Sequence, residues 1–298
     1  MDNSSYSKKI FMEKGIRVAK PKWLRRPLPS GPQYEKIRRL LQKGGLNTVC
    51  SNAKCPNQFE CYSKGTATFL IMGEKCTRGC RFCNIDNGTV LPPDTKEPSK
   101  VAMAAKEMGL KYAVVTSVTR DDLPDGGASF FAETIKELRQ AVSGIKVEVL
   151  IPDFKGDESS IDTVMDALPD VLNHNVETVK RLYSSARPEA VYERSLELLS
   201  YCKKKNTDIL VKSGLMVGLG ETCSELEETI SDIRDTGVDF LTIGQYLQPT
   251  AAHLPVAEFI PPEQFEYLRS YAKAKGFKGI ASGPFVRSSY HAAEMFES

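Results

Sequence analysis

Short apolar runs alternate with amphipathic segments through most of the chain, beginning at residue 66. Six of these runs have the length and composition of buried strands, and they cover 67–72, 112–117, 146–151, 170–174, 209–216 and 239–243. A helical repeat of apolar positions fills the intervals and continues beyond them, over 98–109, 128–142, 159–168, 177–184, 191–205, 223–236 and 262–275. Strands that alternate with helices in this way are typical of consecutive βα units. The sequence therefore predicts an α/β fold built on a parallel sheet.

The cysteines are concentrated around the first predicted strand. Of eight cysteines, six lie between residues 50 and 83, and they form two triplets. The first is Cys50-x4-Cys55-x5-Cys61 and the second is Cys76-x3-Cys80-x2-Cys83. Structural zinc sites use paired ligands and four protein groups, so two sets of three fit zinc poorly. Three thiolates match a [4Fe–4S] cubane in which one iron is left for another ligand.

The second triplet carries the most specific signal. It lies in the segment MGEKCTRGCRFCNID, directly after the predicted strand 67–72, and Phe82 precedes its last cysteine. This arrangement resembles the defining motif of the radical S-adenosylmethionine (radical SAM) enzymes. The resemblance implies that Cys76, Cys80 and Cys83 hold a [4Fe–4S] cluster whose open iron binds S-adenosylmethionine. Reduction by one electron then gives a 5′-deoxyadenosyl radical. The alternative interpretation is a cysteine-rich zinc loop.

The first triplet, in the segment CSNAKCPNQFEC, resembles the auxiliary-cluster motif of the lipoyl synthase family. The resemblance covers about 270 residues, from the tryptophan segment that begins at residue 21 to residue 298. Further matching segments are RDDL at 120–123, DGG at 125–127, NHNVET at 173–178, YERSL at 192–196, GLMVGLGE at 214–221 and RSSY at 287–290. The cysteine spacing alone indicates only that there are two cubane clusters.

The resemblance also makes the expected fold more specific. Radical SAM enzymes share a partial (β/α)6, TIM-like barrel, and the six predicted strands agree with it. We expect the barrel over 66–279, an N-terminal extension with the first triplet over 1–65, and a C-terminal extension with the RSSY motif over 280–298. Active sites of parallel barrels gather at the carboxyl ends of the strands. We therefore expect the two extensions to cover that open end.

The activity that the resemblance implies is that of a radical SAM sulfurtransferase. Such an enzyme inserts two sulfur atoms, at C6 and C8, into a protein-bound octanoyl-lysine and produces the lipoyl cofactor. These carbons have no acidic hydrogen for a general base to remove, so a radical from a cofactor is required. Each lipoyl group uses two molecules of S-adenosylmethionine and consumes the auxiliary [4Fe–4S] cluster as the sulfur donor. No side chain is expected to act as a catalytic acid or base, and His174 is expected to be structural.

In the lipoyl synthase family, three thiolates and a serine oxygen of the RSSY motif hold the auxiliary cluster. The matching residues are Cys50, Cys55, Cys61 and Ser289, with Ser288 as the alternative serine. A serine alkoxide is a harder ligand than a thiolate, so its iron is the expected point at which the cluster opens. The structural alternative is that the two serines cap a terminal turn.

Contacts to S-adenosylmethionine are expected near the ends of the predicted strands. The glycine segment 214–221 resembles the motif that packs against the adenine, and Ser117 and Asp121 stand where relatives bind the methionine amine. The Gly-Gly-Glu sequence that usually binds this amine is replaced here. Arg187 matches a carboxylate partner or, as readily, a surface arginine beside Pro188. The expected contacts are Phe82, Ser117, Asn175, Glu177, Arg187 and Gly218.

Charge is distributed unevenly although the whole chain is nearly neutral. Lys and Arg number 40 and Asp and Glu number 38, which gives a net charge of +2. Residues 1–43 hold twelve basic and three acidic residues and so carry +9, while the remainder carries −7. We hypothesise that this basic arm steers acidic carrier domains toward the enzyme. A sequence pI of about 8.0 does not favour a nucleic acid as partner.

The sequence predicts a cytoplasmic protein without membrane attachment. Its apolar runs are much shorter than the roughly 20 residues of a membrane span. The amino terminus, MDNSSYSKKIFMEKG, has no apolar stretch after its charges and does not match a secretory signal. In a reducing compartment the cysteines are expected to be metal ligands or free thiols rather than disulfides.

Several partners follow from the resemblance. They are an octanoylated carrier protein (a glycine-cleavage H protein or a lipoyl domain of a 2-oxoacid dehydrogenase E2), a flavodoxin or ferredoxin as electron donor, and an iron–sulfur carrier that rebuilds the auxiliary cluster. Alternative functions are a biotin synthase, which matches only the second triplet, and a tRNA methylthiotransferase, which usually ends in an RNA-binding module. Outside enzymes, the alternatives are an iron–sulfur carrier and a zinc-stabilised RNA-binding module.

Overall fold

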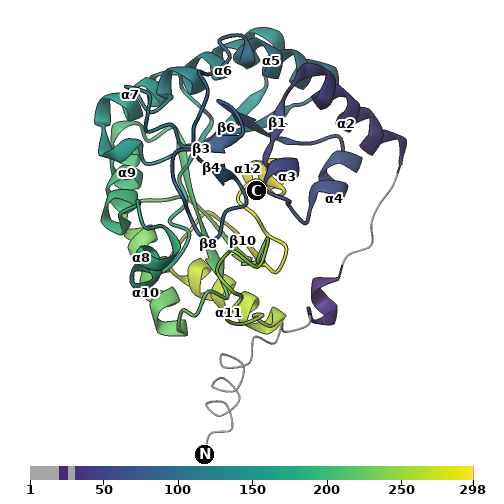
Figure 1. The fold of residues 1–298 in the computed structure, drawn as a ribbon. Helices are drawn as coiled ribbons and strands as arrows, with labels where there is room; N and C mark the ends of the chain where they lie inside the picture. Colours follow the sequence, from purple (N-terminus) through teal and green to yellow (C-terminus); the bar gives the residue numbers. More distant parts are fainter. Residues whose placement is uncertain (1–19, 26–30, 298) are drawn as a thin grey trace, which may run out of the picture.

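One curved sheet forms the centre of the computed structural model, which describes residues 20–25 and 31–297 (Figure 1). Within these residues the strands follow the order β1-β2-β5-β6-β7-β8-β9-β10. Neighbours from β2 to β10 are parallel, whereas β1 is antiparallel to β2. The bounds are β1 Asn47–Thr48, β2 Thr68–Ile71, β5 Tyr112–Ser117, β6 Lys146–Leu150, β7 Val171–Asn173, β8 Leu210–Val217, β9 Phe240–Gln245 and β10 Gly279–Gly283.

The sheet is an open barrel, since its described edges are β1 on one side and β10 on the other. This confirms the predicted α/β class, and all six predicted strands are present. The sequence does not predict β10, because its segment GIASG consists mostly of glycines and small residues with low strand propensity. Its pairing with β9 and a hydrogen bond from Ser282 Oγ to the carbonyl oxygen of Phe265 (2.8 Å) hold it in the sheet.

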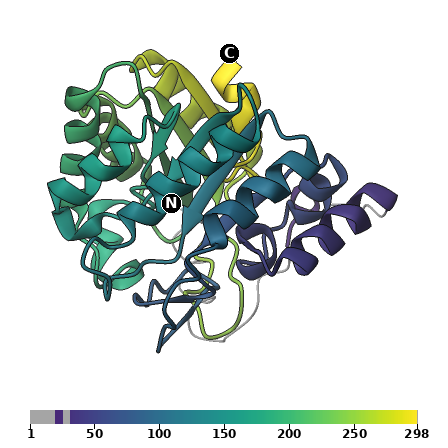
Figure 2. The ribbon, with the colours of Figure 1, turned by 90° about the horizontal axis from the view of Figure 1, so that it is seen from above.

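Helices cover the outer face of the sheet (Figures 1 and 2). The helices that correspond to predicted ones are α5 Glu97–Met108, α6 Ala128–Ala141, α7 Glu158–Asp166, α9 Tyr192–Lys205, α10 Cys223–Asp235 and α11 Pro262–Ala274. The remaining elements are α2 Pro32–Gly44, α3 Val49–Asn52, α4 Gln58–Ser63, α8 Tyr183–Ala186, α12 Ala292–Glu297, the short 3-10 helices η1 Lys22–Leu24, η2 Phe154–Gly156 and η3 Lys180–Leu182, and the paired strands β3 Lys75–Cys76 and β4 Asp86–Asn87.

The predicted helix 177–184 is wrong over its first residues. There the chain forms an isolated bridge to β8 instead of a helix, since Glu177 N donates to Gly214 O (2.9 Å) and Met216 N donates to Glu177 O (2.8 Å), and Glu177 has a φ of +73°. The chain then turns through η3 into the short helix α8. Pairing with a neighbouring strand therefore overrides the local helical pattern.

Apolar stripes of the helices pack against the sheet and form the core. On α6, for example, Phe131, Ile135 and Leu138 are fully buried. Each such side chain contributes about 1.5–3 kcal/mol through the apolar surface it removes from water. None of the helices in the described parts of the chain has both the length and the apolar character needed to cross a membrane.

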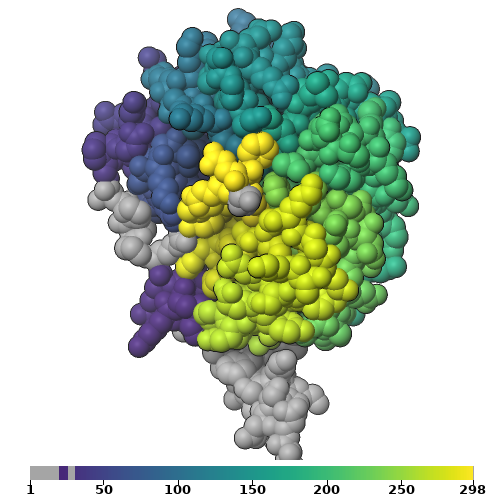
Figure 3. Space-filling model, turned by 180° about the vertical axis from the view of Figure 1, so that it is seen from behind, coloured from purple at the N-terminus to yellow at the C-terminus, as the bar shows by residue number. Residues whose placement is uncertain are grey.

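The C-terminal extension ends at the amino-terminal side of the barrel. In α12, Met295 clusters with Val171 and Phe240, which are the first residues of β7 and β9. Seen from behind, the C-terminal residues cover the centre of the barrel (Figure 3). We expected this extension to lie over the carboxyl ends of the strands, whereas the chain after β10 runs back through the interior and places its last helix at the other end.

A buried ion pair lies inside the barrel, close to α12. Lys212 Nζ, from β8, is 2.9 Å from Glu148 Oε1, from β6, and both side chains are 1% exposed. Tyr112 OH donates to Glu148 Oε2 (2.7 Å), and Asn173 Nδ2 donates to Glu148 Oε1 (3.2 Å). The carboxylate thus has three partners from three other strands (β5, β7 and β8), which compensate for its loss of hydration.

We predict that Lys212→Met lowers the free energy of unfolding by about 3–5 kcal/mol, because it leaves Glu148 charged, buried and without its cation. Urea unfolding followed by circular dichroism measures this loss. The exposed Lys106→Met is the matched control and should stay within about 0.5 kcal/mol of the parent. Equal midpoints for the two variants would contradict the structural role of the pair.

His174, the residue after β7, is buried and neutral. One ring nitrogen lies 2.9 Å from Ile151 O and the other lies 3.0 Å from Ser195 Oγ. Burial lowers the pKa of His174 to about 4, and the positive charge of Arg187 lowers it further. This placement confirms the expectation that His174 is structural.

The unfolded chain binds a proton at His174 below pH 6.5, whereas the folded chain does so only near pH 4. The stabilising contribution is therefore complete above pH 6.5 and is lost as the pH falls toward 4. We predict that the parent loses about 2 kcal/mol more of its unfolding free energy between pH 7 and pH 5 than His174→Gln does. Urea unfolding at the two pH values tests this prediction. An equal loss of unfolding free energy between pH 7 and pH 5 in both proteins would refute it.

Candidate functional site

The second cysteine triplet lies on the loop that follows β2, at the carboxyl end of that strand. Cys76 Sγ accepts hydrogen bonds from the backbone N–H groups of Arg78 (3.4 Å) and Thr119 (3.3 Å). Burial, with the charges of Cys80 and Cys76, raises the pKa of Cys83 to about 12. Burial also raises the pKa of Cys80, against the opposing positive charge of Arg187. The structure thus brings these three thiols into one group.

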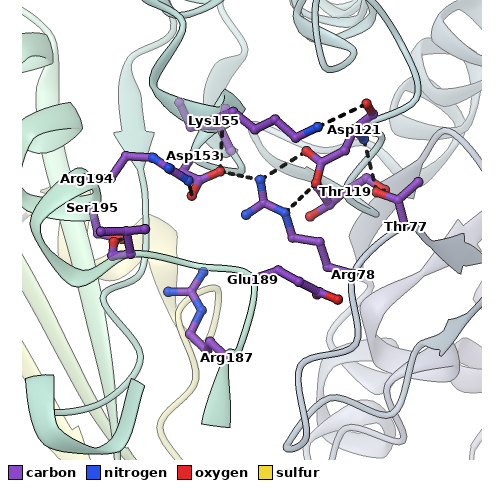
Figure 4. A network of polar contacts seen from close by, with 12 residues as sticks. Thr77, Arg78, Thr119, Asp121, Asp153, Lys155, Arg187, Glu189, Arg194 and Ser195 are labelled. Atoms are coloured by element: carbon purple, nitrogen blue, oxygen red, sulfur yellow. Dashed lines mark hydrogen bonds and ion pairs between the residues drawn. The ribbon is translucent and has the colours of Figure 1, made fainter. Parts of the chain in front are cut away.

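Arg78 fixes the cysteine loop to the barrel (Figure 4). Its guanidinium is 5% exposed and makes two hydrogen bonds to Asp121, from Nε to Oδ2 (2.7 Å) and from Nη2 to Oδ1 (3.0 Å). A third bond joins Nη2 to Asp153 Oδ1 (2.6 Å). Asp153 is fully buried and also pairs with Arg194 (3.2 Å). Because Asp121 follows β5 and Asp153 follows β6, Arg78 ties the loop to two strand ends.

This pairing changes the interpretation of Asp121. The sequence places it where relatives bind the methionine amine, but both of its carboxylate oxygens accept hydrogen bonds from Arg78. Its backbone N–H donates to Thr77 Oγ1 (3.0 Å), which is also on the cysteine loop. In this structure Asp121 therefore stabilises the cysteine loop by hydrogen bonds to Arg78 and Thr77.

Two of the expected cofactor contacts carry buried polar atoms without a hydrogen-bond partner among the described residues. They are Ser117 Oγ, at the end of β5, and Arg187 Nε. An unsatisfied buried donor costs about 1–3 kcal/mol. Arg187 is held in place by donation from Nη1 to Asn175 O (3.2 Å) and to Tyr183 OH (3.2 Å). Both positions fit a polar ligand, and at Arg187 a carboxylate would supply the missing acceptor.

Asn175 and Glu177 lie beside Arg187, on the segment that follows β7. Asn175 Nδ2 donates to Glu177 Oε1 (3.1 Å), and Asn175 Oδ1 accepts from Ser288 Oγ (2.9 Å). Burial raises the pKa of Glu177, and the charge of Arg187 opposes this effect. The structure thus groups these three expected contacts near Cys80.

Gly218 and Phe82 are the remaining expected contacts. Gly218 has a φ of +98°, and a β-carbon there would lie 2.4 Å from Glu258 O, so the turn after β8 requires glycine whether or not a cofactor binds. Glu221 Oε2 accepts from Leu219 N (2.8 Å) and closes this turn. Phe82 is partly buried in the turn between Cys80 and Cys83.

The first triplet comes from two short helices and the loop between them. Cys50 lies in α3, Cys55 in the loop and Cys61 in α4. Burial and the charge of Cys55 raise the pKa of Cys50 to about 12 and that of Cys61 to about 11. A thiol with so high a pKa is protonated at neutral pH unless a metal binds it, because ligation requires the thiolate.

Thr68, the first residue of β2, connects this triplet to the C-terminal motif. Its backbone N–H donates to the Cys50 sulfur, and its Oγ1 donates to Ser289 Oγ (2.8 Å). Ser288, in contrast, donates to Asn175 on the other side of the interior. Cys50, Cys61 and Ser289 also line one cavity of about 420 Å³. The structure thus brings Ser289, and not Ser288, to the first triplet.

The two triplets lie at opposite ends of β2. The first is beside Thr68, where the strand begins, and the second is on the loop after Ile71, where the strand ends. Three steps of about 3.3 Å make this strand about 10 Å long. The two thiol groups are therefore separate sites that belong to one barrel.

The two thiol groups supply donors of the kind that iron–sulfur clusters use. Within residues 20–25 and 31–297, no three His, Cys, Asp or Glu side chains converge on a position for a single metal ion. In a cubane each thiolate binds a different iron, so three thiols leave one iron for another ligand. The backbone N–H groups directed at Cys76 and Cys50 are the kind of hydrogen bonds that tune such clusters.

Sequence reasoning does not identify Thr68 or Asp153. Thr68 is an ordinary strand residue, and Asp153 belongs to no motif. Arg78, however, stands between two cysteines of the second triplet. A charged residue between two expected cluster ligands needs a partner if it is buried, so the sequence does carry a signal for Arg78.

Comparison with known proteins identifies the same regions. The model of the radical SAM superfamily matches residues 70–233, and the model of the N-terminal domain of lipoyl synthase matches residues 1–55. A lipoyl synthase of Desulfotalea psychrophila is 57% identical over 94% of this chain and 94% of its own length. That of Chlorobaculum tepidum is 54% identical over 93% of this chain and 96% of its own length.

Solved structures agree with the fold. Methylornithine synthase superposes with a TM-score of 0.55 at 14% identity, over 83% of this chain and 74% of its own. The FeFe-hydrogenase maturase of Carboxydothermus hydrogenoformans gives a TM-score of 0.57 at 14% identity, over 98% of this chain and 68% of its own. A member of the radical SAM superfamily uses a [4Fe–4S] cluster and S-adenosylmethionine. By its two family models and by its identity to relatives over nearly the whole length, this chain belongs to the lipoyl synthases, enzymes of that superfamily.

Proposed function

We propose that this lipoyl synthase inserts sulfur at C6 and C8 of an octanoyl group attached to a lysine of a carrier protein. Its auxiliary [4Fe–4S] cluster is the sulfur donor, and two molecules of S-adenosylmethionine are used per lipoyl group. The observation that best supports this proposal is the contact of Thr68 with both Cys50 and Ser289, since it gives a second, separate donor set within the same barrel.

In this proposal Cys76, Cys80 and Cys83 hold the cluster that binds S-adenosylmethionine. The buried Arg187 faces the carboxylate of that cofactor through its unpartnered Nε, and Ser117 offers a buried hydroxyl. Asn175 and Glu177 bond the polar end of the cofactor, while Phe82 and Gly218 provide contacts beside the cluster and at the adenine. When bound, the cluster and cofactor supply a radical that removes hydrogen from unactivated carbons.

The auxiliary cluster is held by Cys50, Cys55, Cys61 and Ser289. Three of these ligands are soft thiolates and one is a hard oxygen, so the bond to Ser289 is the weakest match to a sulfide-bound iron. That asymmetry favours loss of one particular iron when sulfur is removed. The hydroxyl of Thr68 already donates to Ser289 Oγ and holds this oxygen beside Cys50.

The chain divides by role into three regions in this proposal. Residues 66–279 form the barrel, 1–65 supply the auxiliary cysteines, and 280–298 supply the serine ligand. The basic arm within 1–43 steers an acidic carrier domain, although Lys8, Lys9, Lys14, Arg17 and Arg26 lie outside the described residues. The carrier is an H protein or an E2 lipoyl domain, the electrons come from a flavodoxin or ferredoxin, and an iron–sulfur carrier rebuilds the auxiliary cluster in the cytoplasm.

Anaerobic turnover with dithionite, S-adenosylmethionine and an octanoyl-lysine peptide tests the proposal. We expect the parent to add two sulfur atoms once per chain. Cys61→Ala should still form 5′-deoxyadenosine but add no sulfur, and Cys83→Ala should form neither product. Cys223→Ala removes an exposed cysteine outside both triplets and should match the parent. Mass spectrometry follows both products, and sulfur insertion by Cys61→Ala would disprove the donor role of the auxiliary cluster.

We predict that Arg78→Met lowers the cluster content to about half, because removing one partner of a buried ion pair costs about 3–5 kcal/mol and frees the loop that carries Cys76 and Cys80. The auxiliary cluster should remain. Iron and sulfide per chain measure the change, and Lys75→Met, an exposed lysine of the same loop, is the control. Full cluster content in Arg78→Met would show that the loop does not depend on this network.

A further inference from the structure

Two side chains in the gap between Cys55 and Cys61 hold the C-terminal segment. The first is Asn57, whose Nδ2 donates to Phe285 O (2.7 Å). Asn57 is 1% exposed and stands directly before α4, the helix that carries Cys61. Since an amide donor buried this deeply needs an acceptor, the bond fixes the backbone at residue 285.

The second side chain is Glu60, which precedes Cys61 on α4. Its carboxylate accepts from Tyr290 OH at 3.0 and 3.1 Å. Lys64 Nζ lies 2.9 Å from Glu60 Oε1, and His291 Nε2 lies 3.4 Å from the same oxygen. A carboxylate is a strong acceptor, so this contact fixes the segment again at residues 290 and 291.

The two contacts enclose Ser289. One lies four residues before it, at Phe285, and the other lies at the next residue, Tyr290. Between them Ser289 Oγ is directed at Thr68, beside Cys50. Both holding residues come from the five-residue stretch between two auxiliary cysteines. The serine and the thiols are therefore tied to the same short piece of chain.

We propose that Asn57 and Glu60 are positioning residues that form a clamp on the C-terminal segment and hold Ser289 as the fourth ligand of the auxiliary cluster. The inference rests on the proposed function of Ser289 and adds the residues that keep it in place. The clamp consists of side-chain hydrogen bonds, and helix α4 carries both Glu60 and Cys61. The strength of the clamp therefore sets how firmly Ser289 is held beside Cys50 and how readily the serine-bound iron is lost.

The clamp itself is tested on the full-length apoprotein, without any cluster. Glu60→Ala removes the acceptor and Tyr290→Phe removes only the hydroxyl donor. Limited trypsin digestion at Arg287, followed by mass spectrometry, should be about tenfold faster in both variants, because cleavage follows the fraction of chains in which the segment is released. Glu294→Ala is the control, since it removes a carboxylate of α12 that bonds His291 and leaves the hydrogen bond between Glu60 and Tyr290 in place. It should be cleaved at the parent rate.

The effect of the clamp on Ser289 as a cluster ligand is tested on the full chain with Cys76, Cys80 and Cys83 replaced by alanine. All iron bound to this variant then belongs to the auxiliary cluster. The anaerobic rate at which the first iron passes to a ferrous chelator should rise about tenfold in Glu60→Ala and Tyr290→Phe. Glu294→Ala should equal its parent. Ser289→Ala provides the reference in which the serine ligand is absent, and its first iron should be lost at least as fast.

Each result leads to a different conclusion. Unchanged digestion of Glu60→Ala and Tyr290→Phe would overturn the clamp. Faster digestion with unchanged iron loss would show that the contacts are only structural and would overturn the positioning role. Unchanged iron loss in Ser289→Ala would instead disprove the proposed ligand, which separates a failure of the proposed function from a failure of the clamp.

Discussion

The organisation of the site depends on the length and rigidity of strand β2. Its four residues are buried, and the strand pairs with β1 on one edge and β5 on the other. A strand bonded on both edges cannot shorten or bend without losing backbone hydrogen bonds, so the groups at its two ends keep a fixed separation. At one end of the strand Thr68 contacts Cys50 and Ser289, and at the other end the loop after Ile71 carries the second triplet. Two thiol sets this close in sequence remain distinct because a paired strand separates them.

The polar groups inside the barrel divide into two kinds. Near α12 the charges of Glu148 and Lys212 are paired, and Tyr112 and Asn173 donate to the same carboxylate, although Asn173 Oδ1 itself has no partner among the described residues. Those near the cysteine loop include Ser117 Oγ and Arg187 Nε, which have no partner in the described residues. An interior that pairs its charges at one end and leaves donors unpaired at the other is arranged for a polar ligand at the second end. The positions of the unpaired donors therefore indicate that a polar ligand binds at the end of the barrel that carries the cysteine loop.

Much of this could be predicted from the sequence, because it follows from local patterns. The six main strands and six helices follow from apolar periodicity, and both cysteine triplets follow from spacing. What could not be predicted depends on contacts between distant segments. Strand β10 forms because β9 offers an edge, and residue 177 is not helical because it forms a bridge with β8. Thr68 is important because both Cys50 and Ser289 contact it. None of these partners is visible in the residues themselves.

The path of the C-terminal segment explains the glycine at position 244 and adds to the reason for the one at position 214. A β-carbon at Gly244 on β9 would lie 2.1 Å from Val286 O. One at Gly214 on β8 would lie 2.6 Å from Thr242 Oγ1 and 2.7 Å from Asn175 Oδ1, with Ser288 Oγ next at 3.1 Å. Neither glycine needs a left-handed backbone, so the reason for them is space. These two strands thus lack side chains where the segment passes through the barrel, which lets Ser289 reach the auxiliary thiols from the far end of the sequence. A bulkier residue at Gly244 would meet backbone, which cannot move aside as a flexible side chain can, and would displace the segment that carries the serine.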